Sequence, residues 1–161
     1  MKQLILLRHG RAEPERSGSR DFDRSLSRTG AADVLSAART MSEAGVKPGL
    51  ALVSPARRTS ETWAAIASGF TNCVVSEDAR LYMASGPMIQ QIAGSLGDQT
   101  AVIVVGHNPG LQQAALALAR SAGDTEAAHS LSRGLPTGGG AVIYFDEGQT
   151  LASRVRLFGI S

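Results

Sequence analysis

The chain has 161 residues, a length that suits one domain with a core large enough to need no disulfide or metal support. Apolar residues make up 43% of the chain and charged residues 19%, which is typical of a globular protein, and the net charge of +2 is too small to indicate a nucleic-acid surface. A single cysteine, Cys73, excludes an intramolecular disulfide and offers no metal-ligand spacing, and its apolar neighbours predict a small buried side chain there. The chain also lacks paired Asp, Glu and His ligands, so we expect no catalytic metal, and we expect no cofactor.

The first predicted element is a buried strand. Four apolar residues at positions 4–7 stop abruptly at Arg8, His9 and Gly10, and a short continuous apolar run is typical of a strand covered on both faces. Ligands of open α/β sheets bind beyond the carboxyl ends of such strands, which makes this end a candidate site. The run is too short for a signal-peptide core, and no run approaches the length of a membrane span. We therefore expect a cytoplasmic protein without membrane contact.

Helices and strands alternate through most of the remaining chain. Residues 11–28 lack apolar periodicity and predict a long loop, which at that length is usually functional or disordered. The elements predicted after it, in chain order, are a helix at 29–45, a strand at 50–53, a helix at 55–69, a short strand at 74–75, a helix at 87–96, a strand at 101–105 and a helix at 109–119. A polar tract at 120–140 ends in three glycines and predicts turns or a close backbone approach. Two apolar runs, 141–145 and 151–158, predict a hairpin at the edge of the sheet.

This alternation predicts an α/β fold in a single domain spanning residues 1–161. We expect a three-layer α/β/α sandwich with a mostly parallel central sheet and an antiparallel edge hairpin. The carboxyl ends of parallel strands meet at one edge of a sheet. His9 and His107, which follow two separate buried strands, should therefore lie at the same edge.

Histidines and arginines at this edge suit the chemistry of phosphoryl transfer. Neutral imidazole is a good nucleophile near physiological pH, and its attack on phosphorus gives a phosphoramidate that water can later cleave. Arginine neutralises the phosphoryl oxygens; Arg8 adjoins His9, while Arg57 and Arg58 begin the helix after the second strand. The amino end of that helix also offers unpaired N–H groups to an anion. We predict one anionic pocket in which His107 is a charged hydrogen-bond donor.

Three motifs resemble those of the histidine phosphatase superfamily, which includes the phosphoglycerate mutases. They are Arg8-His9-Gly10, Ser54-Pro55-x-x-Arg58-x-x-Glu61-Thr62 and Gly106-His107-Asn108. The segments Asp21-Phe22-Asp23-Arg24-Ser25-Leu26-Ser27-x-x-Gly30 and 105–111 resemble most its compact SixA-type branch of phosphohistidine phosphatases. The resemblance extends from Leu4 to about Phe145 and implies a phosphoglycerate mutase-like version of the fold.

The resemblance also implies a role for individual residues. It makes His9 the nucleophile that becomes phosphorylated. The other residues that it assigns to the phosphoryl group and the substrate are Arg8, Arg58 and His107, with Arg24, Asn108 and Gly10 as further contacts. Arg57 is then a solvated helix residue. The chain departs from the superfamily at Glu61, where glutamine is usual, and we expect this change to have little consequence.

The general acid is left open. Larger members of the superfamily place a glutamate in mid-chain to protonate an alcohol leaving group, and the candidates here are Glu77, Asp78 and Asp21 in the long loop. For each of them the preferred interpretation is a solvated loop carboxylate. Resemblance to the SixA-type branch implies that no such acid is needed, because phosphohistidine releases imidazole, a better leaving group than an alkoxide.

The sequence therefore predicts a metal-independent phosphatase that removes phosphate from phosphohistidine on a partner protein, such as a histidine-containing phosphotransfer domain. Two alternatives remain open. One is a phosphomonoesterase for a small phosphorylated metabolite, which needs a general acid. The other is a phosphate-binding module without turnover, although mere binding needs no nucleophile such as His9. Among other residues, we expect His129 to be exposed, Trp63 to pack in the core and Thr137 to line the pocket wall.

Overall fold

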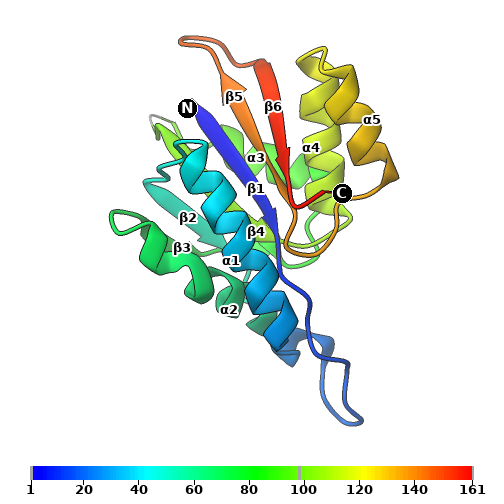
Figure 1. Cartoon of the computed structure of the whole chain (residues 1–161). Coiled ribbons are helices and arrows are strands. Elements are labelled where there is room, and N and C mark those ends of the chain that lie inside the picture. The colour runs from blue at the N-terminus through cyan, green and yellow to red at the C-terminus, as the bar shows by residue number, and fades with distance from the viewer. Residues whose placement is uncertain (1, 98, 161) are drawn as a thin grey trace.

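The computed structural model describes residues 2–97 and 99–160 and contains a six-stranded sheet with helices on both faces (Figure 1). Strands are ordered β3-β2-β4-β1-β5-β6 across the sheet. The parallel strands are β1 (Gln3–Arg8), β2 (Leu50–Val53), β3 (Val74–Glu77) and β4 (Ala101–Gly106), and the antiparallel ones are β5 (Gly140–Phe145) and β6 (Ala152–Phe158). This arrangement confirms the predicted α/β/α sandwich with an antiparallel edge hairpin.

Two helical layers bury the two faces of the sheet. Alternate side chains of β1 point to opposite faces because the side-chain period of a strand is two residues. Leu4 and Leu6 join the core cluster under α3 (Gly86–Gly94), α4 (Gly110–Ser121) and α5 (Thr125–Arg133). Ile5 and Leu7 join the cluster under α1 (Arg28–Glu43) and α2 (Arg57–Ile66). The continuous apolar run of β1 is therefore a consequence of burial on both sides.

The register of the parallel strands brings their carboxyl ends to one edge. Arg8 at the end of β1 pairs with Gly106 at the end of β4, and Val53 at the end of β2 pairs with Val105. The segments that leave this edge lead into α2 and α4, and the long loop after β1 returns to α1 (Figure 1). Short 3-10 turns at Asp21–Asp23, Ala67–Gly69 and Ala79–Leu81 complete the connections.

Several predicted details are wrong. Residues 125–133 form α5 rather than irregular polar structure: Asp124 caps the helix, and only Ala127 and Leu131, four residues apart, are buried. Two buried positions in nine residues are too few for a visible apolar period. Cys73 is partly exposed instead of buried, because it precedes β3, whose side chains are all exposed at the sheet edge. Trp63 is buried, as predicted.

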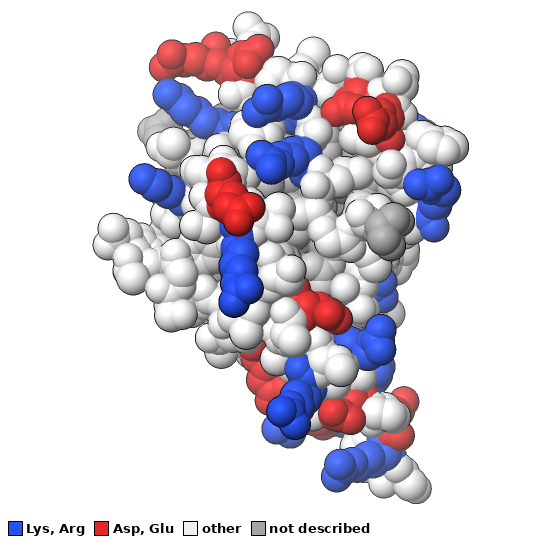
Figure 2. Space-filling view, viewed as in Figure 1, with Lys and Arg blue, Asp and Glu red and all other residues white. Residues whose placement is uncertain are grey.

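The surface carries charges of both signs. On the face drawn in Figure 2, Lys and Arg side chains alternate with Asp and Glu side chains. The ion pairs of the protein include Arg20–Asp23 and Arg57–Glu61. His129 is exposed, as predicted. No helix in the described part of the chain is long and apolar enough to cross a membrane.

Candidate active site

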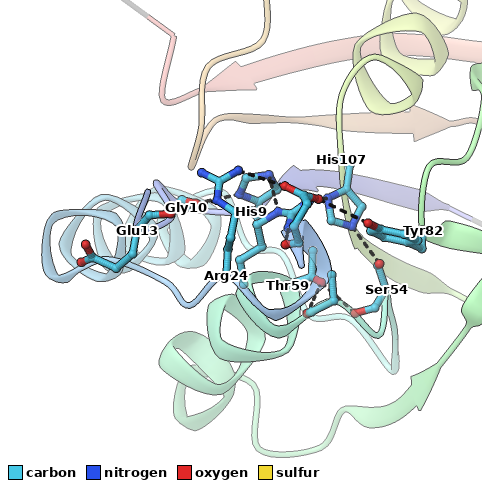
Figure 3. Close-up of polar contacts among 11 residues, drawn as sticks. His9, Gly10, Glu13, Arg24, Ser54, Thr59, Tyr82 and His107 are labelled. Carbon is cyan, nitrogen blue, oxygen red and sulfur yellow. Dashed lines mark hydrogen bonds and ion pairs between the residues drawn. The ribbon is translucent and has the colours of Figure 1, made fainter. Parts of the chain in front are cut away.

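The structure places His9 and His107 side by side, as the sequence predicts. They follow β1 and β4 at paired positions, and their ring centroids are 5.3 Å apart. Both are buried, with 9% and 5% of their surfaces exposed. Figure 3 shows the two imidazoles in the network of polar contacts beyond the sheet edge.

The contacts of His9 define which ring nitrogen is nucleophilic. Nδ1 lies 2.7 Å from the carbonyl oxygen of Gly10, which can only accept, so Nδ1 carries the proton. Nε2 keeps its lone pair and accepts a hydrogen bond from Nε of Arg58 at 3.3 Å. Burial is the main cause that lowers the pKa of His9 to about 4; the nearby arginines act in the same direction, and the hydrogen bond to Gly10 opposes them. His9 is therefore a neutral imidazole at neutral pH.

Gly10 holds this geometry in place. Its N–H donates to Oγ1 of Thr62 at 3.0 Å, while its carbonyl oxygen orients His9. A Cβ at this position would lie 2.6 Å from the carbonyl oxygen of Gly30 and 2.7 Å from Cδ1 of Leu26. Only glycine fits where the chain turns from β1 into the long loop.

Arg58 connects both histidines to the long loop. It lies in the first turn of α2 with 5% of its surface exposed. Besides the contact with His9, Nη1 donates to the carbonyl oxygen of Asp21 at 2.7 Å, and Nη2 donates to Oδ2 of Asp21 at 3.0 Å and to Nδ1 of His107 at 3.3 Å. Every guanidinium nitrogen thus has a partner. Arg57 is exposed and pairs with Glu61, in agreement with its predicted place on the surface.

His107 is neutral, which contradicts the prediction of a charged donor. Its Nδ1 accepts from Arg58, so the ring proton lies on Nε2, which donates to Oγ of Ser54 at 2.8 Å. Burial is the main cause that lowers the pKa of His107 to about 3, and the charge of Arg58 adds to it. A histidine enclosed beside a buried guanidinium cannot hold a second positive charge at neutral pH.

Arg8 and Asn108 converge on one backbone oxygen. Nη1 of Arg8 and Nδ2 of Asn108 both donate to the carbonyl oxygen of Leu135, at 2.7 and 2.9 Å. The glycine-rich segment packs against the same strand end, where the N–H of Gly138 donates to the carbonyl oxygen of His9 at 3.0 Å. This is the close backbone approach that the sequence predicts, and Thr137 lies partly exposed in the same segment.

The long loop brings Arg24 and Asp21 to the site. Arg24 is anchored by donation from Nε to the carbonyl oxygen of Glu13 at 2.9 Å (Figure 3). Its Nη1 donates to Oδ1 of Asp21 at 3.0 Å. Oδ2 of Asp21 accepts from Arg58 and from the hydroxyl of Tyr82 at 3.3 Å. Burial raises the pKa of Asp21, but the hydrogen bonds and charges of the arginines outweigh it and hold the pKa below its ordinary value. Asp21 is therefore an ionised carboxylate at this site.

Comparison with known proteins identifies the family. The model of the histidine phosphatase superfamily, branch 1, matches residues 4–82. SixA from Agrobacterium tumefaciens, a protein named as a phosphohistidine phosphatase, is 29% identical with a TM-score of 0.79, over 89% of this chain and 91% of that one. SixA from Nakamurella multipartitia, named likewise, is 26% identical with a TM-score of 0.76, over 88% of this chain and 83% of that one. The chain belongs to the histidine phosphatase superfamily.

A third relative is longer than the chain. An uncharacterized chloroplastic protein of Arabidopsis thaliana is 34% identical over 125 residues, which cover 71% of this chain and 57% of that protein. The match thus spans little more than half the length of this curated relative. Within the described residues, no group of three or more His, Cys, Asp and Glu side chains could hold a metal ion.

The carboxylates considered as general acids differ in their position. Glu77 is exposed at the end of the edge strand β3. Asp78 accepts from the backbone N–H of Arg80 and pairs with its guanidinium at 2.6 Å, and these contacts hold the pKa of Asp78 below its ordinary value. The structure shows neither residue in contact with the histidines, whereas Asp21 is bonded to Arg58.

Glu61 has a structural role that the sequence analysis missed. Its Oε2 accepts from the backbone N–H of Leu26 at 2.6 Å, and its Oε1 accepts from Nε of Arg57 at 2.7 Å. Glu61 thus ties the long loop to α2 and also holds Arg57. A glutamine here would keep one oxygen that can accept from Leu26 but would lose the ion pair with Arg57. That the departure from the superfamily has little consequence stays a prediction.

Two further residues belong to the site. Ser54, which the motif includes without a role, fixes the tautomer of His107. Tyr82 packs edge-on against His107 (Figure 3), with ring centroids 5.6 Å apart. Its hydroxyl donates to Oδ2 of Asp21. The sequence alone gives no sign that Tyr82 lies in the site. Its place there depends on how the turn after β3 folds back over the sheet edge.

Proposed function

We propose that the protein is a phosphatase that accepts a phosphoryl group on Nε2 of His9 and passes it to water, and that its substrate is phosphohistidine on a partner protein such as a histidine-containing phosphotransfer domain. The observation that carries the proposal is the state of His9. Its ring is neutral, its Nδ1–H is fixed by Gly10, and its Nε2 lone pair faces Arg58.

Binding of the phosphoryl group uses the donors that surround His9. Arg58 and Arg8 supply guanidinium groups that neutralise the equatorial oxygens. Nδ1 of His107 faces the same guanidinium as Nε2 of His9. A phosphoryl dianion beside His107 raises its pKa by Coulombic attraction, so that Nδ1 takes up a proton and donates to an oxygen of the group. The charged donor predicted from the sequence then forms on binding.

The reaction proceeds through two displacements at phosphorus. Nε2 of His9 forms a bond to phosphorus while the bond to the leaving group breaks and its electron pair goes to the leaving atom. The phosphorylated ring of His9 is a cation that keeps its Nδ1–H bonded to Gly10. Water then forms a bond to phosphorus while the bond from phosphorus to Nε2 breaks and its electron pair returns to Nε2. A proton of the water passes to solvent, which leaves inorganic phosphate and neutral His9.

The state and position of the carboxylates support phosphohistidine, rather than a phosphate ester, as the substrate. An alkoxide leaving group requires a protonated acid at the site, but Asp21 is ionised and the structure shows neither Glu77 nor Asp78 in contact with the histidines. Imidazole needs no such acid. The two SixA proteins similar to this chain are named as phosphohistidine phosphatases. We further propose that the protein acts in the cytoplasm and that arginines supply the charge neutralisation without a metal ion.

The test compares two substrates under the same conditions. A phosphorylated histidine-containing phosphotransfer domain and an alkyl phosphate are each mixed with the wild-type protein in the presence of EDTA, with His9→Ala as the control. We expect rapid loss of label from the phosphohistidine only, and none above background with the variant. Faster hydrolysis of the alkyl phosphate, lost on removal of Glu77 or Asp78, would establish the metabolite phosphomonoesterase instead. Tight phosphate binding without turnover of either substrate would establish a binding module.

A further inference from the structure

Asp21 is the one carboxylate in the polar network around the two histidines, among the residues that the structure describes. Its Oδ1 is bonded to Arg24, and its Oδ2 is bonded to both Arg58 and Tyr82. A negative charge next to a phosphoryl-binding site repels the substrate, so its presence there needs an explanation. The leaving group of the proposed substrate provides one.

A phosphoryl group changes the partners of Asp21. Arg58 donates to the phosphoryl oxygens through the same nitrogens that now contact Asp21 and the two histidines. Oδ2 of Asp21 then loses a charged donor, while Oδ1 keeps Arg24 and Oδ2 keeps the hydroxyl of Tyr82. The carboxylate remains anchored beside the reacting group with free acceptor capacity.

We propose that Oδ2 of Asp21 accepts a hydrogen bond from the distal ring N–H of the substrate phosphohistidine, and so selects leaving groups that are cationic nitrogen heterocycles. This inference rests on the proposed function and assigns to Asp21 the role of an acceptor, not that of a proton donor. It is the counterpart of the contact between His9 Nδ1 and the carbonyl oxygen of Gly10. Both imidazoles that exchange the phosphoryl group would have their distal N–H held by a fixed oxygen.

The step balances without a further acid. In the reactive substrate one ring nitrogen carries phosphorus and the other carries a proton, so the ring is a cation. When Nε2 of His9 bonds to phosphorus, the P–N bond of the substrate breaks and its electron pair stays on that nitrogen. The product is a neutral imidazole that keeps its distal N–H. A carboxylate beside this N–H stabilises the cationic form of the substrate, which is the form that leaves as a neutral molecule.

The surroundings of Asp21 suit a flat ring. Phe22 and Tyr82 meet edge to face with ring centroids 5.1 Å apart, next to the carboxylate. Both aromatic side chains are partly exposed, and the guanidinium of Arg20 already lies 5.8 Å from the centroid of the Phe22 ring. Aromatic edges and faces pack well against an imidazole, and a cationic ring is attracted to their faces.

The test uses Asp21→Asn with two phosphoryl donors. One donor is a phosphohistidine-containing phosphotransfer domain, and the other is p-nitrophenyl phosphate, whose leaving group is an anion without an N–H. Phosphorylation of His9 is followed in single turnovers, where slow rates remain measurable. We expect the variant to lose about 10- to 100-fold in rate with phosphohistidine, the usual worth of a hydrogen bond to a charged group, and to lose much less with the aryl phosphate.

Asp23→Asn is the matched control, because Asp23 lies on the same 3-10 turn but pairs with the exposed Arg20. It should leave both rates unchanged. Asp21→Glu should restore part of the preference for phosphohistidine. A second measurement on Asp21→Asn is its affinity for inorganic phosphate, which should not weaken, because the variant removes a competitor for Arg58.

An equal loss with both donors, or weaker phosphate binding, would show that Asp21 only positions Arg58 and would overturn the inference. Failure of the proposed function looks different. In that case the wild-type protein itself would not dephosphorylate phosphohistidine faster than His9→Ala does.

Discussion

Acid should destabilise the protein through its two buried histidines, and His107→Gln should remove about half of this effect. The pKa values of His9 and His107 are lowered from 6.5 to about 4 and about 3 in the folded protein. Between pH 6.5 and these values, the unfolded chain binds protons that the folded protein excludes. Stability is therefore complete above about pH 6.5 and is lost as the pH falls. Each histidine therefore lowers the free energy of unfolding at pH 5 by about 2 kcal/mol relative to pH 7.

Urea unfolding at pH 7 and pH 5 measures this cost. From pH 7 to pH 5, we expect the free energy of unfolding to fall in both proteins. The fall should be about 2 kcal/mol smaller in His107→Gln than in the wild type. Glutamine retains an amide that can donate to Ser54, and the other titrating groups are common to both proteins. His129→Gln, at an exposed position of α5, is the matched control and should show the wild-type loss. An acid loss in His107→Gln as large as in the wild type would refute the lowered pKa of His107.

Three further results are expected. Gly10→Ala should lower the free energy of unfolding by about 1–3 kcal/mol, because the added methyl group meets the backbone of Gly30. Thermal unfolding measures this loss, and an unchanged stability would contradict the tight packing around Gly10. Glu61→Ala should speed proteolytic cleavage within the long loop several-fold, because the N–H of Leu26 loses its acceptor, whereas Glu61→Gln keeps that acceptor and should stay resistant. The imidazole of His9 should stay neutral from pH 7 to about pH 5 and take up a proton toward pH 4, which NMR titration of the free protein measures; a midpoint near pH 6.5 would contradict its lowered pKa.

The sheet and the two histidines could be predicted because their signal is local. Apolar runs at β1 and β4 end directly before His9 and His107, and the carboxyl ends of parallel strands share an edge whatever connects them. The helix α5 escaped prediction since only Ala127 and Leu131 of its nine residues are buried.

The electrostatic state of the site could not be predicted from the sequence. The neutral form of His107 depends on burial beside Arg58, and the ionised form of Asp21 depends on three donors from separate segments. Glu61 and Tyr82 matter through contacts with the long loop, whose path no apolar period reveals. The sequence thus predicts which site residues follow the strand ends. It does not predict the protonation states of those residues.

The most direct test of the account is the position of the phosphoryl group during turnover. The protein is mixed with phosphorylated phosphotransfer domain, quenched in alkali, which preserves phosphohistidine, and mapped by mass spectrometry. We expect transient phosphorylation of His9 on Nε2, because Nδ1 is held by Gly10. Phosphate on Nδ1 or on another residue, or turnover at the wild-type rate by His9→Ala, would contradict it.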